Sequence, residues 1–235
     1  MPEPYRPPTL RITCNVWSTV PSTVAWLQFH RNSAKHLDYL LLRGINANIV
    51  LLCATCIEGF LVETLKSFMP SQRTDDASFR SRLTEEYYER VHTCSGHAAI
   101  SNLFRLATGR PLSEMITDKP LQEAISVLFT FRNGLAHGRS TEYRSYVGEH
   151  IYDYELEFWG SYSTVEDYLI KVGLLKSRVI EGGSGWDLLT TEVADYFTQQ
   201  VEAYCHAISA ALPSEQSSRM NSLLKSAFDE KLKWA

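Results

Sequence analysis

The chain has 235 residues, of which 44% are hydrophobic and 21% are charged. This composition can bury a substantial core, as one large domain or as one domain with an elaborate insertion, and it excludes an intrinsically disordered chain. The net charge of −4 argues against a bulk nucleic-acid binder, so any RNA contact has to come from a local basic patch or from a groove built by two subunits.

The N-terminal segment is rich in proline and lacks the apolar run of a signal peptide, and no uninterrupted apolar stretch of about eighteen residues follows. The five cysteines are odd in number and scattered along the chain, which favours reduced thiols over a disulfide framework. The sequence therefore predicts a cytoplasmic protein without a membrane-spanning segment.

Two long helices are predicted in the N-terminal third. The first runs from about residue 23 to residue 42, with Ser22 as its N-cap and Gly44 after its end. The second covers residues 47–68, is apolar on most faces, and is stopped by Pro70. A helix of that kind belongs at the centre of a bundle.

The second helix contains two features that need an interpretation. Cys53 and Cys56 form a CxxC pair within an apolar run, where core packing is favoured over a redox or zinc site because no second cysteine pair exists. Glu58 is a carboxylate among apolar neighbours. It belongs to a partly exposed stripe or a simple ion pair, or else it pairs with Arg132 or His137 and supports them.

Three further helices are expected before the midpoint of the chain. Residues 77–92 have charges at three- and four-residue spacing, which is typical of a solvated face. A short helix at 97–107 is closed by Gly109. Pro120 then opens a helix over 121–131, whose single apolar stripe leads into the most informative stretch of the sequence.

That stretch is Phe131-Arg-Asn-Gly-Leu-Ala-His-Gly138. His137 can move a proton to or from a ribose hydroxyl or a leaving oxygen, Arg132 can grip a phosphate and hold developing charge, and Asn133 can orient either. The two glycines allow close approach of a backbone or ligand.

The same pattern also occurs earlier in the chain, at Arg31-Asn-Ser-Ala-Lys-His36, inside the first predicted helix and without the flanking glycines. We interpret it as an accidental match made of ordinary helix residues. Replacing Arg31 or His36 with Ala is then expected to change stability by no more than about 1 kcal/mol at an exposed position.

From residue 140 to residue 186 the chain becomes rich in aromatic residues. Local alternation predicts a β-hairpin of 143–147 against 150–159, followed by a helix at 163–174. The aromatic side chains are candidates for an RNA-stacking surface, a small core or a dimer contact. The segment 182–185 is interpreted as a glycine-rich hinge, because no Lys-Ser or Lys-Thr follows it as in a phosphate-binding loop.

Two helices close the chain, the first over 187–212 and the second after a cap at Ser214. An apolar helix that runs into Arg-Asn, three residues and His-Gly resembles the signature of the HEPN superfamily (higher eukaryotes and prokaryotes nucleotide-binding domain). That resemblance implies a mainly helical antiparallel bundle, here a single domain over 1–235 with 140–186 inserted. It covers about half the chain.

The resemblance also implies a homodimer in which two motifs face one another. On a continuous helix, residues five apart point about 140° away from each other. Arg132 and His137 of one chain therefore converge only if Gly134 breaks the helix, or if a two-fold mate completes a composite site. Arg139 and Arg144 are candidate RNA-binding residues beside it.

The function implied by the resemblance is a metal-independent endoribonuclease without a cofactor, of a toxin or antiviral defence system. Other family members bind RNA or nucleotides without cutting them, so an inert binding or protein-interaction module is the alternative. One branch of the family carries a Tyr two residues after the His, where a partner nucleotidyltransferase attaches nucleotides. This chain has Arg139 there, which disfavours that control but leaves room for a separate antitoxin.

Overall fold

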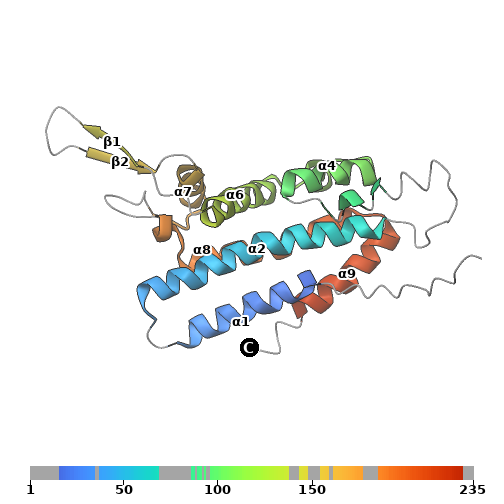
Figure 1. Ribbon diagram of the computed structural model, residues 1–235, viewed down its shortest axis with the longest axis horizontal. Helices are drawn as coiled ribbons and strands as arrows, with labels where there is room; N and C mark the ends of the chain where they lie inside the picture. The colour runs from blue at the N-terminus through green and yellow to red at the C-terminus, as the bar shows by residue number, and fades with distance from the viewer. Residues whose placement is uncertain are drawn as a thin grey trace, which may run out of the picture.

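A computed structural model describes residues 16–34, 37–68, 86–87, 89–91, 93, 96–137, 143–147, 154–158, 161–176 and 185–229. The described part is mainly helical, as predicted (Figure 1). Its elements in chain order are η1 Val16–Ser18, α1 Thr19–Ser33, α2 Tyr39–Ser67, α4 His97–Thr108, α5 Leu112–Met115, α6 Lys119–Ala136, β1 Tyr143–Val147, β2 Tyr154–Phe158, α7 Ser161–Lys171, η2 Gly185–Leu188, α8 Thr191–Ala211 and α9 Ser214–Asp229.

Helix α2 is the spine of the bundle. It is 29 residues long and packs against α8, α1, α6 and α4, so it is covered on several sides (Figure 1). Cys53 and Cys56 are both buried in this core, as the packing interpretation expects. Buried residues from η1 through α9 form one hydrophobic cluster around α2.

By length and composition, α2 is also the one described helix that is long and apolar enough to cross a membrane, with a mean hydropathy of 1.8. Just over half of that segment, 56%, is buried inside the protein. The central helix of a water-exposed bundle passes the same test, so this property is weak evidence for a membrane-spanning role.

The predicted first helix over 23–42 is wrong in both of its ends. Helix α1 stops at Ser33, Ala34 is extended, and α2 begins at Tyr39 because the Asp38 side chain accepts a hydrogen bond from the Leu40 N–H. The break was not predicted because apolar residues recur at helical spacing on both sides of it. Gly44, expected after the end of the helix, lies inside α2.

Helix α4 ends at Gly109, whose φ of +73° is the left-handed conformation of a helix C-cap, as predicted. Helix α6 starts at Lys119 because the Asp118 side chain accepts a hydrogen bond from the Leu121 N–H. It continues to Ala136, beyond the predicted end at residue 131, and therefore runs through the Arg-Asn-x3-His segment without a break.

Gly134 serves packing inside this continuous helix. A Cβ placed on it would lie 3.1 Å from Cζ of Tyr162, which is tighter than ordinary van der Waals contact. The close approach that this glycine permits is thus made by the Tyr162 ring of α7. Tyr162 also packs edge-on against Phe131, with ring centroids 6.2 Å apart.

A hairpin is present within residues 140–186, as predicted, with a second strand at Tyr154–Phe158; residues 150–153 and 159 of the predicted strand lie outside the described residues. Strands β1 and β2 pair antiparallel, with Tyr143 opposite Phe158 and Val147 opposite Tyr154, and Figure 1 shows them at the edge of the bundle beside α7. Helix α7, at Ser161–Lys171, nearly coincides with the helix predicted at 163–174. Helix α8 begins at Thr191 rather than 187, because η2 precedes it and the Thr190 side chain accepts a hydrogen bond from the Val193 N–H.

Several predictions fall on parts of the chain outside the described residues. Only 86–87, 89–91 and 93 of the polar helix predicted at 77–92 are described, and these positions are helical. Pro70, Gly138 and residues 182–184 also lie outside the described ranges.

Candidate functional site

Helix α6 brings Arg132 and Asn133 to the rim of a cavity of about 730 Å³. The cavity is bounded by the first turn of α4, by α5 and the loop after it, by α6, and by single residues of α2 and α8. Its polar and aromatic lining includes Glu58, His97, Phe129, Arg132, Asn133 and Tyr204. Five separate helices thus supply the groups of one concave site.

Arg132 is held by two contacts. Its Nη2 lies 3.9 Å from Oε2 of Glu58 on α2, and its Nη1 donates a hydrogen bond of 3.0 Å to Oδ1 of its neighbour Asn133. The ion pair is long, and the side chains of Arg132 and Glu58 are 31% and 20% exposed. The guanidinium is therefore oriented by the protein while it still has donors for an incoming anion.

The contact between Glu58 and Arg132 is the geometry expected if this carboxylate supports the motif. Glu58 projects from the central helix α2 toward Arg132 of α6 and lines the same cavity. Its supporting role stays a prediction, because an ion pair of this length and exposure stabilises a fold by no more than about 1 kcal/mol.

His137 occupies a different position from Arg132. It is the C-cap residue of α6, where its backbone N–H donates to the Asn133 carbonyl at 3.2 Å, and its side chain is exposed. It is not among the residues that line the cavity. Because α6 is continuous here, Arg132 and His137 of one chain point in different directions.

The cavity contains a second histidine that the sequence analysis did not single out. The ring of His97 packs on the ring of Phe129, with centroids 4.6 Å apart and an interplanar angle of 31°. Its Nε2 lies 3.4 Å from the Tyr204 hydroxyl. Burial lowers the pKa of His97 and raises the pKa of Tyr204, so both are neutral near pH 7.

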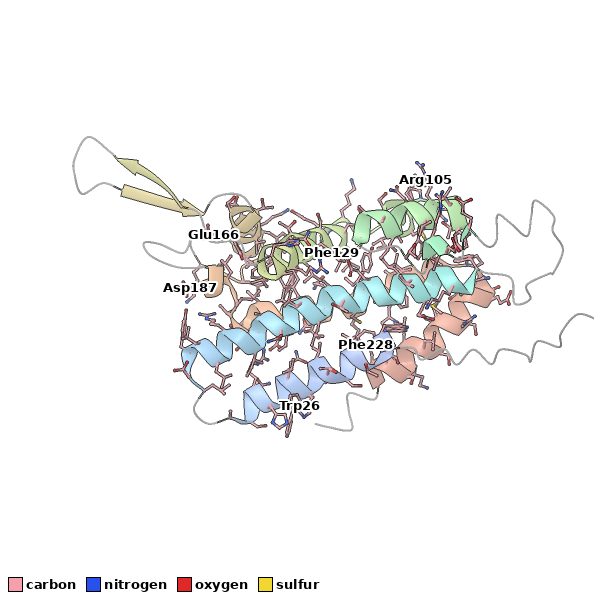
Figure 2. The ribbon with its side chains drawn as sticks, in the orientation of Figure 1. Trp26, Arg105, Phe129, Glu166, Asp187 and Phe228 are labelled. Carbon is pink, nitrogen blue, oxygen red and sulfur yellow. The ribbon has the colours of Figure 1, made fainter. Side chains whose placement is uncertain are left out.

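No local pattern marks His97, because its surroundings are created by tertiary packing. Residue 97 is the first residue of α4, Phe129 lies on α6 and Tyr204 lies on α8 (Figure 2 labels Phe129). The one signal in the sequence is that Phe129 precedes Arg132 by three residues, which places both on the same face of a helix.

Arg31, which begins the other copy of the motif, has a structural role. Arg31 is only 4% exposed, and its Nη2 donates to both carboxylate oxygens of Asp195 on α8, at 2.7 and 2.9 Å. Its Nη1 donates to Oδ1 of the fully buried Asn46 at 3.0 Å, and Asn46 in turn donates to the Leu189 carbonyl. Arg31 thus joins α1 to α2 and α8.

The expectation that Arg31 is an ordinary exposed helix residue is therefore wrong. Helix α1 packs against α2, and the guanidinium is bonded on two sides, by Asn46 of α2 and Asp195 of α8, which leaves Arg31 buried. His36 lies outside the described residues.

The structure does not test the two candidate RNA-binding arginines. Arg139 lies outside the described residues, and Arg144 is described only as a position in β1, where its register partner is Glu157. Their contacts with RNA stay predictions.

The assembled site offers a cation at its rim, a neutral imidazole packed on an aromatic ring, and an exposed histidine at the nearby helix end. This set suits a planar ring joined to an anion, with proton transfer outside the cavity. Comparisons with protein-family models, with curated proteins and with solved structures find no match to this chain.

Proposed function

We propose that the protein is an endoribonuclease that cleaves RNA without a metal ion at a composite site between two copies of the chain. The observation that carries the proposal is the continuity of α6 through the motif, with Arg132 on the cavity rim and His137 exposed at the C-cap. One copy cannot direct both side chains at one phosphate, whereas a two-fold mate can supply the missing group.

In the proposed reaction, the neutral His137 of one copy removes the proton from a ribose 2′-hydroxyl. The 2′-oxygen attacks the adjacent phosphorus, the bond from phosphorus to the 5′-oxygen breaks, and the protonated His137 of the other copy donates a proton to that oxygen. The products are a 2′,3′-cyclic phosphate and a 5′-hydroxyl.

Arg132 stabilises the negative charge that develops on the phosphate oxygens during this step. Glu58 and Asn133 hold the guanidinium in position from two sides, which limits the side-chain freedom that RNA binding would otherwise have to remove. The exposure of Arg132 and His137 is consistent with a substrate that is a polymer and approaches from solvent.

The chain as a whole has a net charge of −4, so the proposed groove depends on local cations rather than on a basic surface. The resemblance to HEPN proteins extends the proposal to a toxin or antiviral defence role. A separate antitoxin is then a more suitable restraint than nucleotide attachment, because Arg139 stands where attachment would need a Tyr.

The test is incubation of the purified protein with end-labelled total RNA in EDTA. The wild type is expected to be a dimer that cuts RNA and leaves cyclic phosphate ends, with a bell-shaped dependence of rate on pH because one histidine must be neutral and its mate protonated. Arg132→Ala and His137→Ala should each lower the rate by about 10²-fold or more, while RNA binding falls far less.

Two results would overturn the proposal. One is a dimer that leaves every RNA intact with no inhibitor present, or that cuts only with an added divalent metal. The other is a protein that is monomeric at micromolar concentration and still active, since the composite geometry would then have no basis. An RNA-binding or protein-interaction module would replace the nuclease in the first case.

A further inference from the structure

The proposed acid-base step uses Arg132 and His137 but has no use for the aromatic wall of the adjoining cavity. That wall consists of His97 packed on Phe129, and the Tyr204 hydroxyl fixes the orientation of the imidazole from α8. A half-buried imidazole that is held in place by an aromatic ring and a hydroxyl, beside a partly exposed arginine, is not accounted for by that step.

The chemistry of the cavity fits a nucleobase. Its volume of about 730 Å³ is in the range of pockets that enclose a base with its sugar. One face of the His97 ring is covered by Phe129, and His97 also lines the cavity, so the imidazole can present its remaining surface to a flat ligand. Bases stack on such rings in proteins that bind single-stranded nucleic acids.

Polar groups around the same space can contact the edge of a base. Ser101 and Thr130 line the cavity, and each hydroxyl donates to its own helix, to the carbonyls of His97 and Ser126 respectively, which leaves an oxygen lone pair as an acceptor. Asn133 adds an exposed amide at the rim. The cavity is thus apolar and aromatic with a few hydrogen-bonding groups.

Burial keeps His97 neutral near pH 7, since it lowers the pKa of the imidazole. A neutral ring stacks on a base without bringing a buried charge, and it leaves the positive charge of the site on Arg132 at the rim. This division matches the two halves of a nucleotide, which are a flat uncharged base and a phosphate.

We propose that this cavity binds the base of the RNA nucleotide next to the scissile phosphate, stacked on His97, while its phosphate contacts Arg132. The identification of the ligand as an RNA chain rests on the proposed nuclease function. The stacking surface itself rests on the geometry of His97, Phe129 and Tyr204.

The test uses 2-aminopurine, a fluorescent base whose emission falls when it stacks. One probe is a 2′-fluoro pentanucleotide with a single 2-aminopurine, which cannot be cleaved by 2′-hydroxyl attack. The other probe is 2-aminopurine riboside monophosphate. Wild type is expected to quench the pentanucleotide, and His97→Ala to weaken its binding by about 5- to 150-fold, which corresponds to the loss of one stacked base.

Two variants separate stacking from a general loss of structure. His97→Phe keeps a ring in place and should retain the quenching, and His206→Ala is the matched control. His206 also lies near a phenylalanine, with its ring centroid 6.3 Å from that of Phe228, but it does not line the cavity.

A steric block tests the same site without altering His97. Ser126 is exposed and lines the cavity, so Ser126→Trp should exclude the base, whereas Ser218→Trp at an exposed position of α9 should bind like wild type. The proposal is overturned if either His97→Ala or Ser126→Trp binds and quenches the pentanucleotide as the wild type does. It is also overturned if wild type quenches neither probe, or quenches the monophosphate alone.

These outcomes are separate from the fate of the nuclease proposal. If the quenching depends on His97 but no RNA is cut, the base pocket stands and the nuclease fails. If RNA cleavage depends on His137 while His97→Ala binds and quenches as the wild type does, the nuclease stands and the base pocket fails.

Discussion

The chain contains the pattern Arg-Asn-x3-His twice, and the two copies begin in the same way. Arg31 lies in the last turn of α1, and Arg132 lies in the last turns of α6. Each arginine donates a hydrogen bond to the Asn that follows it, at 3.1 Å for Arg31 and 3.0 Å for Arg132. The shared local sequence thus produces a shared local contact.

Everything beyond that contact differs. The guanidinium of Arg31 is buried, bonded to both oxygens of Asp195, and bonded to Asn46. Arg132 is 31% exposed and has one long ion pair, with Glu58 at 3.9 Å. A cation whose donors are occupied by a carboxylate cannot take a phosphate, whereas one with spare donors on a cavity rim can. The residues that pack around a motif in the fold, rather than its amino-acid sequence, decide whether it is available for chemistry.

The largest difference that we expect between the two copies is in how much their arginines stabilise the fold. Arg31→Ala should lower the free energy of unfolding by about 3 kcal/mol, at the lower end of the range for removing one partner of a buried ion pair, because the Asp195 side chain is 35% exposed and can be partly hydrated. Urea unfolding measures it.

Arg132→Ala is the matched control for Arg31→Ala and should cost no more than about 1 kcal/mol, because its ion pair is long and partly exposed. If the two variants lose the same stability, the structural distinction between the two arginines is incorrect.

The next effect concerns the glycine inside the second copy. Gly134 and Gly44 both lie within helices, where Ala is favoured by about 1 kcal/mol, but nothing lies within 4 Å of a Cβ on Gly44 while Tyr162 crowds a Cβ on Gly134. We expect Gly134→Ala to be less stable than Gly44→Ala by about 1 to 3 kcal/mol, which is the usual cost of overpacking.

Thermal or urea unfolding of the two glycine variants checks this difference. An equal gain of stability in both would show that Tyr162 does not pack against α6 as described, and that the glycine in the motif serves something other than packing.

Glu58→Gln should have a smaller effect on stability and should also lower activity. Loss of this long ion pair should change the free energy of unfolding by less than about 1 kcal/mol, yet cleavage should fall, by less than the roughly 10²-fold expected for removing Arg132 itself. Urea unfolding measures the change in stability, and cleavage rates measure the change in activity.

Glu123→Gln provides the control for Glu58→Gln. Glu123 forms an exposed ion pair with Lys171 at 2.7 Å and does not line the cavity. Loss of the Glu123 ion pair should change the free energy of unfolding as little as Glu58→Gln does, and it should leave cleavage at the wild-type rate. A Glu58→Gln enzyme that cuts as fast as Glu123→Gln would remove the supporting role of Glu58.

The smallest effect is a pH dependence of stability from His97. Burial lowers the folded-state pKa of His97 below its ordinary value of 6.5, so the unfolded state takes up a proton first as the pH falls. The stability contribution of the neutral ring is fully present above about pH 6.5 and is lost as the pH falls toward the folded-state pKa.

His97→Phe cannot bind this proton, so its stability should fall less steeply than that of the wild type as the pH is lowered from 7 to 5. Parallel stability profiles for the two proteins would mean that His97 is not buried against Phe129.

Much of the fold was predictable because helices and hairpins leave periodic patterns. The hairpin strand at 143–147, the end of α4 at Gly109 and the apolar central helix were each predicted from local residues. The break after Ser33 was missed because apolar residues recur on both sides of it. Helix α6 was predicted to end at residue 131, but it continues to Ala136 because the motif carries no helix-breaking residue other than a glycine, which the helix tolerates.

The site was predictable only in part for a related reason. Arg132 and Asn133 were identified from their spacing, and the contact of Glu58 with Arg132 was one of the alternatives. The burial of Arg31 and the stacking of His97 on Phe129 depend on how distant helices meet, and no single segment of sequence records that.

The most direct test of the central claim compares the histidines of the two copies. Cleavage of labelled total RNA in EDTA is measured for the wild type, His137→Ala and His36→Ala, with circular dichroism to show that each protein is folded. The claim predicts a loss of about 10²-fold or more for His137→Ala and a rate near wild type for His36→Ala. A folded His36→Ala protein that has lost cleavage, or a His137→Ala protein that retains it, would contradict the assignment of the chemistry to the second copy.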